Sequence, residues 1–252
     1  MTSERPAAAR DIADYERAYR DSGFEVVQAA FRKRLLLELL ERLRPRRVLE
    51  VGCGFDTLAA HWTGAEHFTV VEPGAQFSAR ARAQTVGRAD VRVIEATLEG
   101  ALPELTGGFD LILLSGLLHE VADCGAILDA ARALADPETV VHANVPNARS
   151  VHRLLAMEMG LIGDVAETSD LQRALQQHRI FTLDSLADLA AAHGFAAFEQ
   201  GSYFIKPFTH AQMLQLQAEG LMTDAMLDGL WGLEKHMPGL GSEIFVNLRR
   251  AA

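Results

Sequence analysis

Short apolar runs alternate with helical patterns along the first half of the chain, and this alternation is the strongest constraint on its fold. Strands are expected at 48–51, 67–72, 91–94, 109–114 and 139–145, and helices at 75–83 and 126–135. Strands separated by helices form parallel sheets that are covered on both faces. Two further strands are expected at 195–205, with Gly201 as a bulge, and at 242–248. The chain is therefore predicted to form an α/β fold with a doubly wound, seven-stranded, mostly parallel sheet.

Helical segments precede and interrupt this pattern. Apolar residues recur at helical spacing from Phe24 to Leu43, and Asp11 to Arg20 is a second expected helix, so residues 1–45 are predicted to form a helical N-terminal cover. Residues 46–252 are predicted to form the α/β domain, with helical insertions at 147–179 and 207–241. Ligands bind beyond the carboxyl ends of the strands in such sheets. The insertions are therefore expected to form a substrate cap, with ornamental packing as the alternative. Helices are expected at 150–159, 169–177, 183–193, 209–220 and 223–236.

Charge and composition narrow the classes of partner. The formal net charge of −10 disfavours nucleic acid, because phosphate binding relies on a surplus of Lys and Arg. The first ten residues lack an apolar signal core, and no run approaches the roughly 18 apolar residues of a membrane span. We therefore expect a cytoplasmic protein with no membrane partner. The two cysteines cannot build a disulfide framework.

A glycine turn follows the first expected strand. The strand runs into Gly52-Cys53-Gly54, and a helical pattern begins at Thr57. Such a turn brings backbone N–H groups close to a ligand. Glu50 lies two residues before the first glycine, and a buried acid needs a hydrogen-bonding partner. The turn therefore predicts a site for a nucleotide-type cofactor.

Two cofactor types compete for this turn. A dinucleotide fingerprint needs a third glycine for close helix packing, and Thr57 stands in its place. Glu50 suggests instead a ligand that carries a cation, such as the ammonium of a methionine moiety. Glu72 ends the second expected strand and is placed to accept hydrogen bonds from both hydroxyls of a ribose, which suits either cofactor type.

Three segments in order, 48–54, 70–73 and 109–121, resemble the class I S-adenosylmethionine-dependent methyltransferases. The resemblance implies a Rossmann-like sheet that ends in an antiparallel hairpin, with S-adenosylmethionine as the cofactor. By this resemblance Glu50 lies near the methionine amino group, the cofactor packs on the turn, Glu72 binds the ribose and Pro73 lines the adenine. The residues packed on the methionine part would be Gly52, Cys53, Gly54, Ser115 and Gly116.

The chain departs from the family pattern at two places. Asp56 replaces the usual third glycine. The family often has an Asp after the third strand to meet the adenine amine, where this chain has Glu95-Ala96-Thr97-Leu98-Glu99, so the Thr97 side chain or the Thr97–Leu98 backbone is expected to take that role. In the N-terminal cover, Tyr15, Tyr19 and Arg32 are expected to reach the methionine carboxylate, Arg32 with a bidentate fork. Their alternative is the surface of an amphipathic helix.

Methyl transfer needs alignment of the acceptor and often a base. Histidine suits that role near neutral pH, and His119, His152 and His210 are the base candidates. His119 could instead pack at a helix start, and His152 with Arg153 could cap the first insertion. Lys206 is expected to face the acceptor together with His210. No His or Cys grouping has metal-ligand spacing.

These residues predict an S-adenosylmethionine-dependent methyltransferase that acts on an oxygen or nitrogen of a small-molecule natural product or a saccharide. Segments similar to Val145–Ile162 occur in bacterial saccharide and natural-product methyltransferases, which favours such an acceptor. The alternatives are methylation of a peptide or protein side chain, and a cofactor-binding module without catalysis. Self-association into a homodimer stays open.

Overall fold

A seven-stranded sheet in the order β3-β2-β1-β4-β5-β7-β6 forms the centre of the protein. The computed structural model describes residues 24–165, 167 and 179–251. Strands β1 to β5 pair in parallel, and β7 is antiparallel to both of its neighbours. The strands are β1 (Arg47–Val51), β2 (His67–Val71), β3 (Val91–Ile94), β4 (Leu111–Ser115), β5 (Val140–Pro146), β6 (Phe195–Tyr203) and β7 (Glu243–Arg250). The predicted fold, with its final antiparallel pair, is confirmed.

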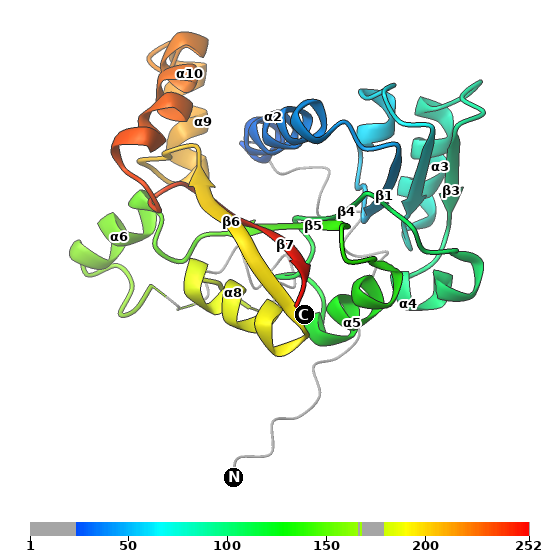
Figure 1. Cartoon of the computed structure of the whole chain (residues 1–252). Helices are drawn as coiled ribbons and strands as arrows, with labels where there is room; N and C mark the ends of the chain where they lie inside the picture. Colours follow the sequence, from blue (N-terminus) through cyan, green and yellow to red (C-terminus); the bar gives the residue numbers. More distant parts are fainter. Residues whose placement is uncertain (1–23, 166, 168–178, 252) are drawn as a thin grey trace.

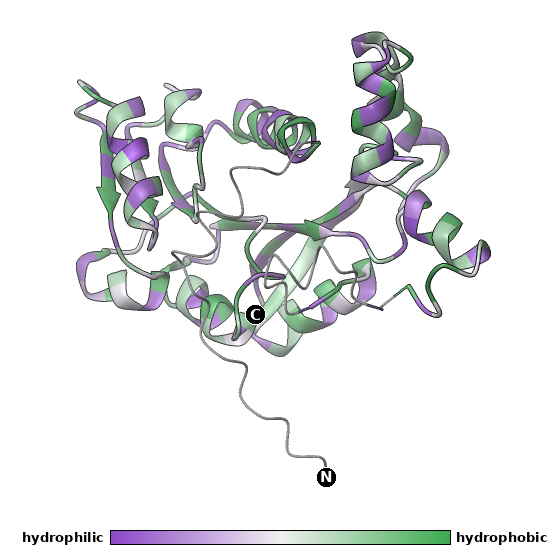
Figure 2. Ribbon diagram, turned by 180° about the vertical axis from the view of Figure 1, so that it is seen from behind, coloured by the Kyte–Doolittle hydropathy of each residue, from purple (hydrophilic) through white to green (hydrophobic). Residues whose placement is uncertain are grey.

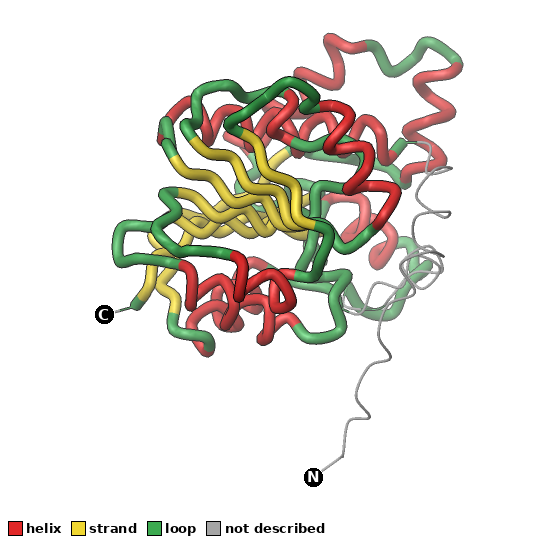
Figure 3. The backbone as a smooth tube through the Cα atoms, turned by 90° about the vertical axis from the view of Figure 1, so that its right-hand side faces the viewer, coloured by secondary structure: helices red, strands yellow, loops and turns green. Residues whose placement is uncertain are grey.

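Helices cover both faces of this sheet (Figures 1 and 3). One face carries α2 (Glu25–Leu43), and the other carries α4 (Leu98–Ala101), α5 (Cys124–Leu134) and α8 (Leu183–Ala192). Beyond the β6 edge, α9 and α10 lie beside the N-terminal end of α2 (Figure 1). The remaining elements are η1 (Leu58–Ala60), α3 (Ala75–Gln84), η2 (Leu102–Glu104), α6 (Val151–Glu158), α9 (His210–Ala218), α10 (Asp224–Gly232) and η3 (Leu233–His236).

Helix α2 packs on two hydrophobic clusters at once. Its C-terminal half buries Leu36, Leu39 and Leu40 against the apolar residues of β1, β2 and β4. Its N-terminal half places Phe31 on Phe204, with the ring centroids 4.1 Å apart. The helices carry both hydrophobic and hydrophilic residues, as expected for elements that cover a sheet with one side and face solvent with the other (Figure 2). Helix α2 therefore joins the parallel part of the sheet to the C-terminal helices.

The segment after the glycine turn differs from the sequence-based expectation. A helix starting at Thr57 was expected, but only the three-residue 3-10 helix η1 forms there. Leu58 and Ala59 belong to the hydrophobic cluster that α2 covers. Since α2 already occupies this face of the sheet, the chain needs only one turn to cross from β1 to β2.

The bulge in β6 was placed at the wrong residue. The register with β7 shifts between Ala197 and Glu199, so Phe198 is the extra residue, whereas Gly201 pairs regularly with Phe245. A Cβ at Gly201 would come within 3.0 Å of the Phe245 ring, so this glycine provides room for a neighbouring side chain. The expected helices at 11–20 and 169–177 lie outside the described residues.

Because β1, β2, β4 and β5 are parallel, their carboxyl-terminal ends lie side by side at one end of the strands, which is called the carboxyl edge of the sheet below. The candidate site residues that follow these strands consequently lie along this carboxyl edge. No helix among the described residues is long and apolar enough to cross a membrane.

Removing apolar contact between α2 and the sheet is expected to destabilise the whole fold. Leu40 is fully buried, so Leu40→Ala should lower the free energy of unfolding by about 2–5 kcal/mol. Val26 lies on the same helix with 74% of its surface exposed, so Val26→Ala should change it by less than about 0.5 kcal/mol. Urea denaturation of both variants measures the difference, and equal effects would contradict the described packing.

Candidate active site

The turn after β1 requires glycine at two positions because of its backbone. Gly52 has φ +75° and Gly54 has φ +54°, a region that side chains with a Cβ rarely adopt. A Cβ at Gly54 would meet no atom within 4 Å, so the space above this residue is open. The half-buried Cys53 lies between them, and burial raises the pKa of its thiol, which stays protonated. The turn thus presents backbone to an open space at the edge of the sheet.

The Glu50 side chain connects the end of β1 to the residues that follow the glycine turn. One carboxylate oxygen accepts the Thr57 hydroxyl at 2.5 Å and the other accepts the Leu58 N–H at 3.1 Å. Burial raises the pKa of Glu50 to about 7, although these two hydrogen bonds act in the opposite direction. The partner that the sequence required for a buried acid is therefore found within the protein, at the far end of the turn.

Glu72 joins the ends of β1 and β2. Its oxygens accept the Gly74 N–H at 2.8 Å and the Gly54 N–H at 3.2 Å. Burial raises the pKa of this carboxyl above its usual value. Pro73 is half-buried between Glu72 and Gly74. Glu72 thus lies directly beside the glycine turn.

The ends of β3 and β4 complete this edge. The Thr97 hydroxyl accepts the Gly100 N–H at 3.2 Å and caps α4, while the Leu98 side chain is buried in the core. Thr97 is itself exposed and follows β3 in the chain. After β4, Ser115 is half-buried and Gly116 has φ +64°.

Arg32 reaches this edge from α2, but its main partners are carboxylates of the protein. Nε donates to Glu243 at 3.0 Å, and Nη2 donates to both Glu243 and Glu25. The third nitrogen, Nη1, lies 3.5 Å from the position that a Cβ on Gly116 would take. The Arg32 Cζ and Nε atoms lie 3.6 Å from the same position, so the guanidinium as a whole lies over Gly116 at the end of β4.

Glu243 is the centre of a buried polar cluster. It accepts hydrogen bonds from Arg32, from the Tyr203 hydroxyl, from Asn144 at 3.0 Å and from Gln28 at 3.2 Å. Burial alone would raise its pKa, but the charge and hydrogen bonds of Arg32 hold the pKa of Glu243 at about 2. This carboxylate is ionised at neutral pH and ties α2, β5, β6 and β7 together.

Two of the three candidate histidines, His119 and His210, are electrostatic neighbours of Glu243. His119 is buried, with Nε2 3.5 Å from Glu120. Burial, followed by the charge of the nearby Lys206, lowers the pKa of His152 well below its usual value, and the same two causes lower the pKa of His210 to about 3. His152 and His210 thus come together at Lys206 and are both neutral at pH 7.

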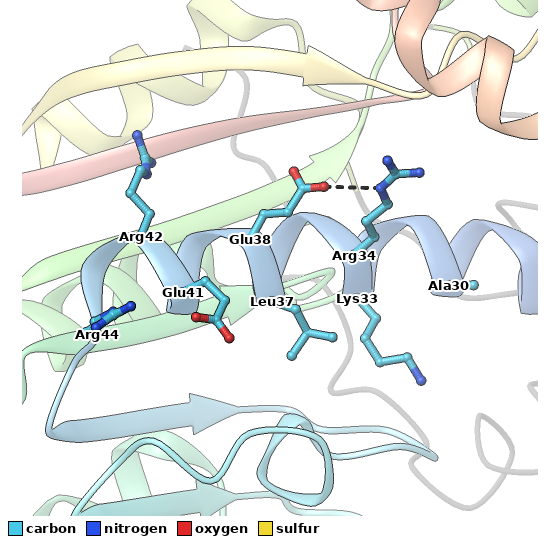
Figure 4. A pocket seen from close by; sticks show the side chains of 8 residues that line it. All are labelled: Ala30, Lys33, Arg34, Leu37, Glu38, Glu41, Arg42 and Arg44. Atoms are coloured by element: carbon cyan, nitrogen blue, oxygen red, sulfur yellow. Dashed lines mark hydrogen bonds and ion pairs between the residues drawn. The ribbon is translucent and has the colours of Figure 1, made fainter.

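A hollow of about 750 Å³ runs along the outer side of α2 (Figure 4). The side chains that line it project from both flanks of the helix, and Arg34 pairs with Glu38 across one turn at 3.1 Å. None of the candidate site residues lines it, so it is a surface feature separate from the glycine turn. Its lining residues are Ala30, Lys33, Arg34, Leu37, Glu38, Glu41, Arg42 and Arg44.

A family model described as a methyltransferase domain matches residues 24–200, which is more than half of the chain. The chain belongs to this methyltransferase family. The class that the sequence resembles is thereby confirmed, and S-adenosylmethionine is the cofactor of this methyltransferase. No curated protein sequence matches the chain.

Solved structures share the fold at low sequence identity. A possible histamine N-methyltransferase from Thermotoga maritima is 16% identical, with a TM-score of 0.59, over 94% of this chain and 98% of that one. The N-methyltransferase NodS from Bradyrhizobium japonicum, solved with S-adenosylhomocysteine, is 12% identical with a TM-score of 0.57, over 95% and 99%. The [4+2]-cyclase SpnF is 18% identical with a TM-score of 0.58, over 87% and 81%. At these identities the likeness shows the fold alone.

The predicted Tyr15 and Tyr19 lie outside the described residues. Some residues of the buried polar cluster around Glu243 were not found from the sequence. Glu243, Asn144 and Gln28 were missed, although each is a polar residue within an otherwise apolar strand or helix face. Such isolated polar residues are the signal that a buried polar cluster leaves in a sequence.

Without Arg32, the buried Glu243 carboxylate has no cationic partner, and we expect the protein to become less stable. Since the Glu243 side chain is 2% exposed, Arg32→Met should lower the free energy of unfolding by about 3–5 kcal/mol at pH 7. Arg42, on the same helix, pairs with Glu199 with 54% of its side chain exposed, so Arg42→Met should cost about 1 kcal/mol or less.

The pH dependence separates this charge effect from lost packing. The pKa of Glu243 is lower in the folded state than in the unfolded state. Its ion pair therefore contributes to the free energy of unfolding above pH 4.5, and this contribution is lost as the pH falls towards about 2. The difference between wild type and Arg32→Met should therefore shrink over that range. A difference that does not change with pH would contradict the ion-pair account.

Proposed function

We propose that this methyltransferase transfers the methyl group of S-adenosylmethionine to an oxygen or nitrogen of a small-molecule natural product or saccharide. The observation that carries the proposal is the set of groups along one sheet edge. The open backbone at Gly54 and the Glu72 carboxylate are joined by a hydrogen bond at the ends of β1 and β2, and the Arg32 guanidinium of α2 lies over Gly116 at the end of β4. These are the groups that a nucleoside joined to an amino acid needs.

Each part of the cofactor has a proposed partner. Glu72 accepts hydrogen bonds from the ribose hydroxyls, beside Pro73, and the backbone of Gly52 and Gly54 packs against the chain that joins the nucleoside to the methionine. Arg32 Nη1 binds the methionine carboxylate while Nε and Nη2 stay on Glu243. The bound cofactor supplies an electrophilic methyl group on a sulfonium.

Glu50 has two proposed roles, one in holding the turn and one in binding the cofactor. Its hydrogen bonds to Thr57 and Leu58 hold the turn, and its charge lies under the turn, where the resemblance places the methionine ammonium. A cation there favours the ionised carboxylate. The remaining candidates, Cys53, Ser115, Gly116, Thr97 and Leu98, line the methionine and adenine parts through their backbone.

The acceptor is proposed to bind beside the cofactor, under the two insertions. Helix α6 carries His152, and α9 begins at His210, so both insertions supply residues to the neighbourhood of Lys206. These segments thus act as a substrate cap in the proposal. A pKa of about 3 makes His210 a weak base candidate, and His152 has the same drawback because burial lowers its pKa well below the usual value.

Cofactor binding is expected to depend on the Glu72 charge. Glu72→Gln keeps the size of the side chain but removes one charge-assisted acceptor for the ribose, so the dissociation constant should rise at least about tenfold. Titration calorimetry with S-adenosylmethionine measures it. Glu138 is 88% exposed, so Glu138→Gln is the matched control and should bind like wild type.

Two outcomes would bear directly on the function. No binding at millimolar S-adenosylmethionine would overturn the proposal as a whole. Binding without transfer of labelled methyl to any phenol, glycoside, amine or peptide in a panel would favour a module without catalysis. That second assay is needed because the same fold occurs in a [4+2]-cyclase.

Cofactor binding is also expected to release a proton from Glu50. The pKa of this carboxyl is about 7, so at pH 6 it is mostly protonated, and a cation placed beside it should ionise it. Calorimetry at pH 6 in buffers of different ionisation enthalpy should show wild type releasing up to about one proton more than Glu50→Gln, a difference that vanishes above about pH 8. Equal proton release would place the methionine ammonium away from Glu50.

A further inference from the structure

Asn144 connects the glycine at the end of β4 to the carboxylate that holds Arg32. Its backbone carbonyl accepts the Gly116 N–H at 3.0 Å. Its side-chain nitrogen, Nδ2, donates to Glu243 and to the Tyr203 hydroxyl, each at 3.0 Å. This fully buried residue is therefore bonded both to Gly116 and to the partner of the guanidinium that lies over Gly116.

The side-chain contacts of Asn144 converge on one oxygen of Glu243. Oε2 accepts from Asn144, from the Tyr203 hydroxyl and from Nε of Arg32. Tyr203 also accepts from Asn144, so the amide reaches this oxygen both directly and through the hydroxyl. Hydrogen bonds in such a buried chain strengthen one another. A displacement of the Asn144 amide would therefore move the oxygen to which Arg32 Nε is bonded.

His142 and Glu243 lie on opposite sides of the Asn144 amide. Its Oδ1 lies 3.3 Å from Nε2 of His142, and Nδ1 of the same ring lies 2.7 Å from Oδ1 of Asn247. His142 is 1% exposed and its ring stacks on Phe245, with the centroids 5.9 Å apart. Turning the amide over would direct Oδ1 at the Glu243 carboxylate, and both of these groups can only accept. The ionised Glu243 therefore keeps the amide nitrogen on its own side.

The chain of contacts continues from His142 to the C-terminal part of α2. Asn247 donates to Glu199 at 2.7 Å, and Glu199 accepts from Arg42 at 2.8 Å and 2.6 Å. Arg42 and Arg32 both belong to α2, ten positions or about 15 Å apart. The chain thus begins and ends on one helix and passes through β5, β6 and β7 between the two arginines. A shift of α2 over the sheet would disturb both ends of the chain.

We propose that Asn144 is a positioning residue, which sets the place where the Arg32 guanidinium meets the methionine carboxylate of S-adenosylmethionine. The inference rests on the proposed cofactor binding and adds a residue to it. Asn144 acts through Glu243 and does not bind the cofactor itself. By holding Oε2, it keeps Nε and Nη2 of Arg32 on Glu243, while Nη1 stays over Gly116 for the carboxylate.

Methyl transfer depends on the precision of this contact. The reaction is an in-line displacement, so the methyl carbon on the sulfonium must lie in the line of attack of the acceptor. The carboxylate and the sulfonium belong to one short ligand, and a misplacement of about 1 Å can cost about a hundredfold in rate. Asn144 fixes the guanidinium relative to Gly116, because it is bonded to both Gly116 and Glu243.

A purely stabilising role of Asn144 would give a different result from a positioning role. Any donor to a buried carboxylate favours its ionised form and thereby the folded state. Loss of such a donor would lower the stability of the protein but would leave the relative affinities of two ligands unchanged. Loss of a positioning residue instead weakens the ligand that carries the carboxylate more than a ligand that lacks it.

The test compares S-adenosylmethionine with its decarboxylated form, which keeps the nucleoside, the sulfonium and the ammonium. Titration calorimetry with the full chain should show that wild type binds S-adenosylmethionine at least about tenfold more tightly, because a charge-assisted hydrogen bond is lost with the carboxylate. Equal binding of the two ligands would show that Arg32 does not bind the carboxylate and would overturn the inference. Absence of binding by both would overturn the proposed function itself.

Asn144→Leu removes the side-chain donors and keeps the approximate size of the residue. We expect the preference for S-adenosylmethionine to fall below about threefold, while the affinity for the decarboxylated form changes by less than about threefold. Val141→Ala is the packing control, because Val141 is fully buried on the same strand. This control should lower the melting temperature but retain the wild-type preference.

Tyr203→Phe provides a second, milder variant. It removes the hydroxyl between Asn144 and Glu243 but leaves their direct hydrogen bond, so the preference should lie between those of wild type and Asn144→Leu. If Asn144→Leu does not fold, Tyr203→Phe carries the test alone. A wild-type preference in both variants, or in the one that folds, would overturn the proposal. An equal loss of affinity for the two ligands would do the same.

Discussion

The ion pair between Arg32 and Glu243 is the interaction on which the arrangement of the active site depends. It joins a helix near the start of the chain to a strand near its end, and the Glu243 side chain is 2% exposed. A charge buried to this degree is tolerated only with a partner and further hydrogen bonds, which Tyr203 and Asn144 provide. The pair therefore fixes α2 to the start of β7, with the Arg32 guanidinium over Gly116 at the carboxyl end of β4.

At the proposed cofactor site, the glycine turn and the residues next to it hold the carboxylates of Glu50 and Glu72 by hydrogen bonds. Glu50 accepts hydrogen bonds from the far end of the turn, and Glu72 accepts one from the backbone of Gly54. Both carboxyls have raised pKa values because they are buried. Both acids are therefore held in place by groups of the protein itself.

The sequence predicted the sheet well because the sheet follows from local patterns. Alternating strands and helices determine the topology, and Gly52, Gly54 and Glu72 lie next to strand ends. The short η1 was not predictable from residues 57–62, because its length depends on α2 packing on the same face. Glu243 was missed for the same kind of reason, since its partner Arg32 lies 211 residues away and no local pattern links them. The bulge was assigned to Gly201, although a large ring across the strand explains that glycine.

The account's central claim is that Arg32 serves the cofactor while it stays bound to Glu243. A crystal structure of the protein with S-adenosylhomocysteine tests this most directly. The account predicts that the amino acid carboxylate lies on Arg32 Nη1, above Gly116, with the Arg32–Glu243 pair intact. A carboxylate bound elsewhere, or an Arg32 side chain that has left Glu243, would contradict it.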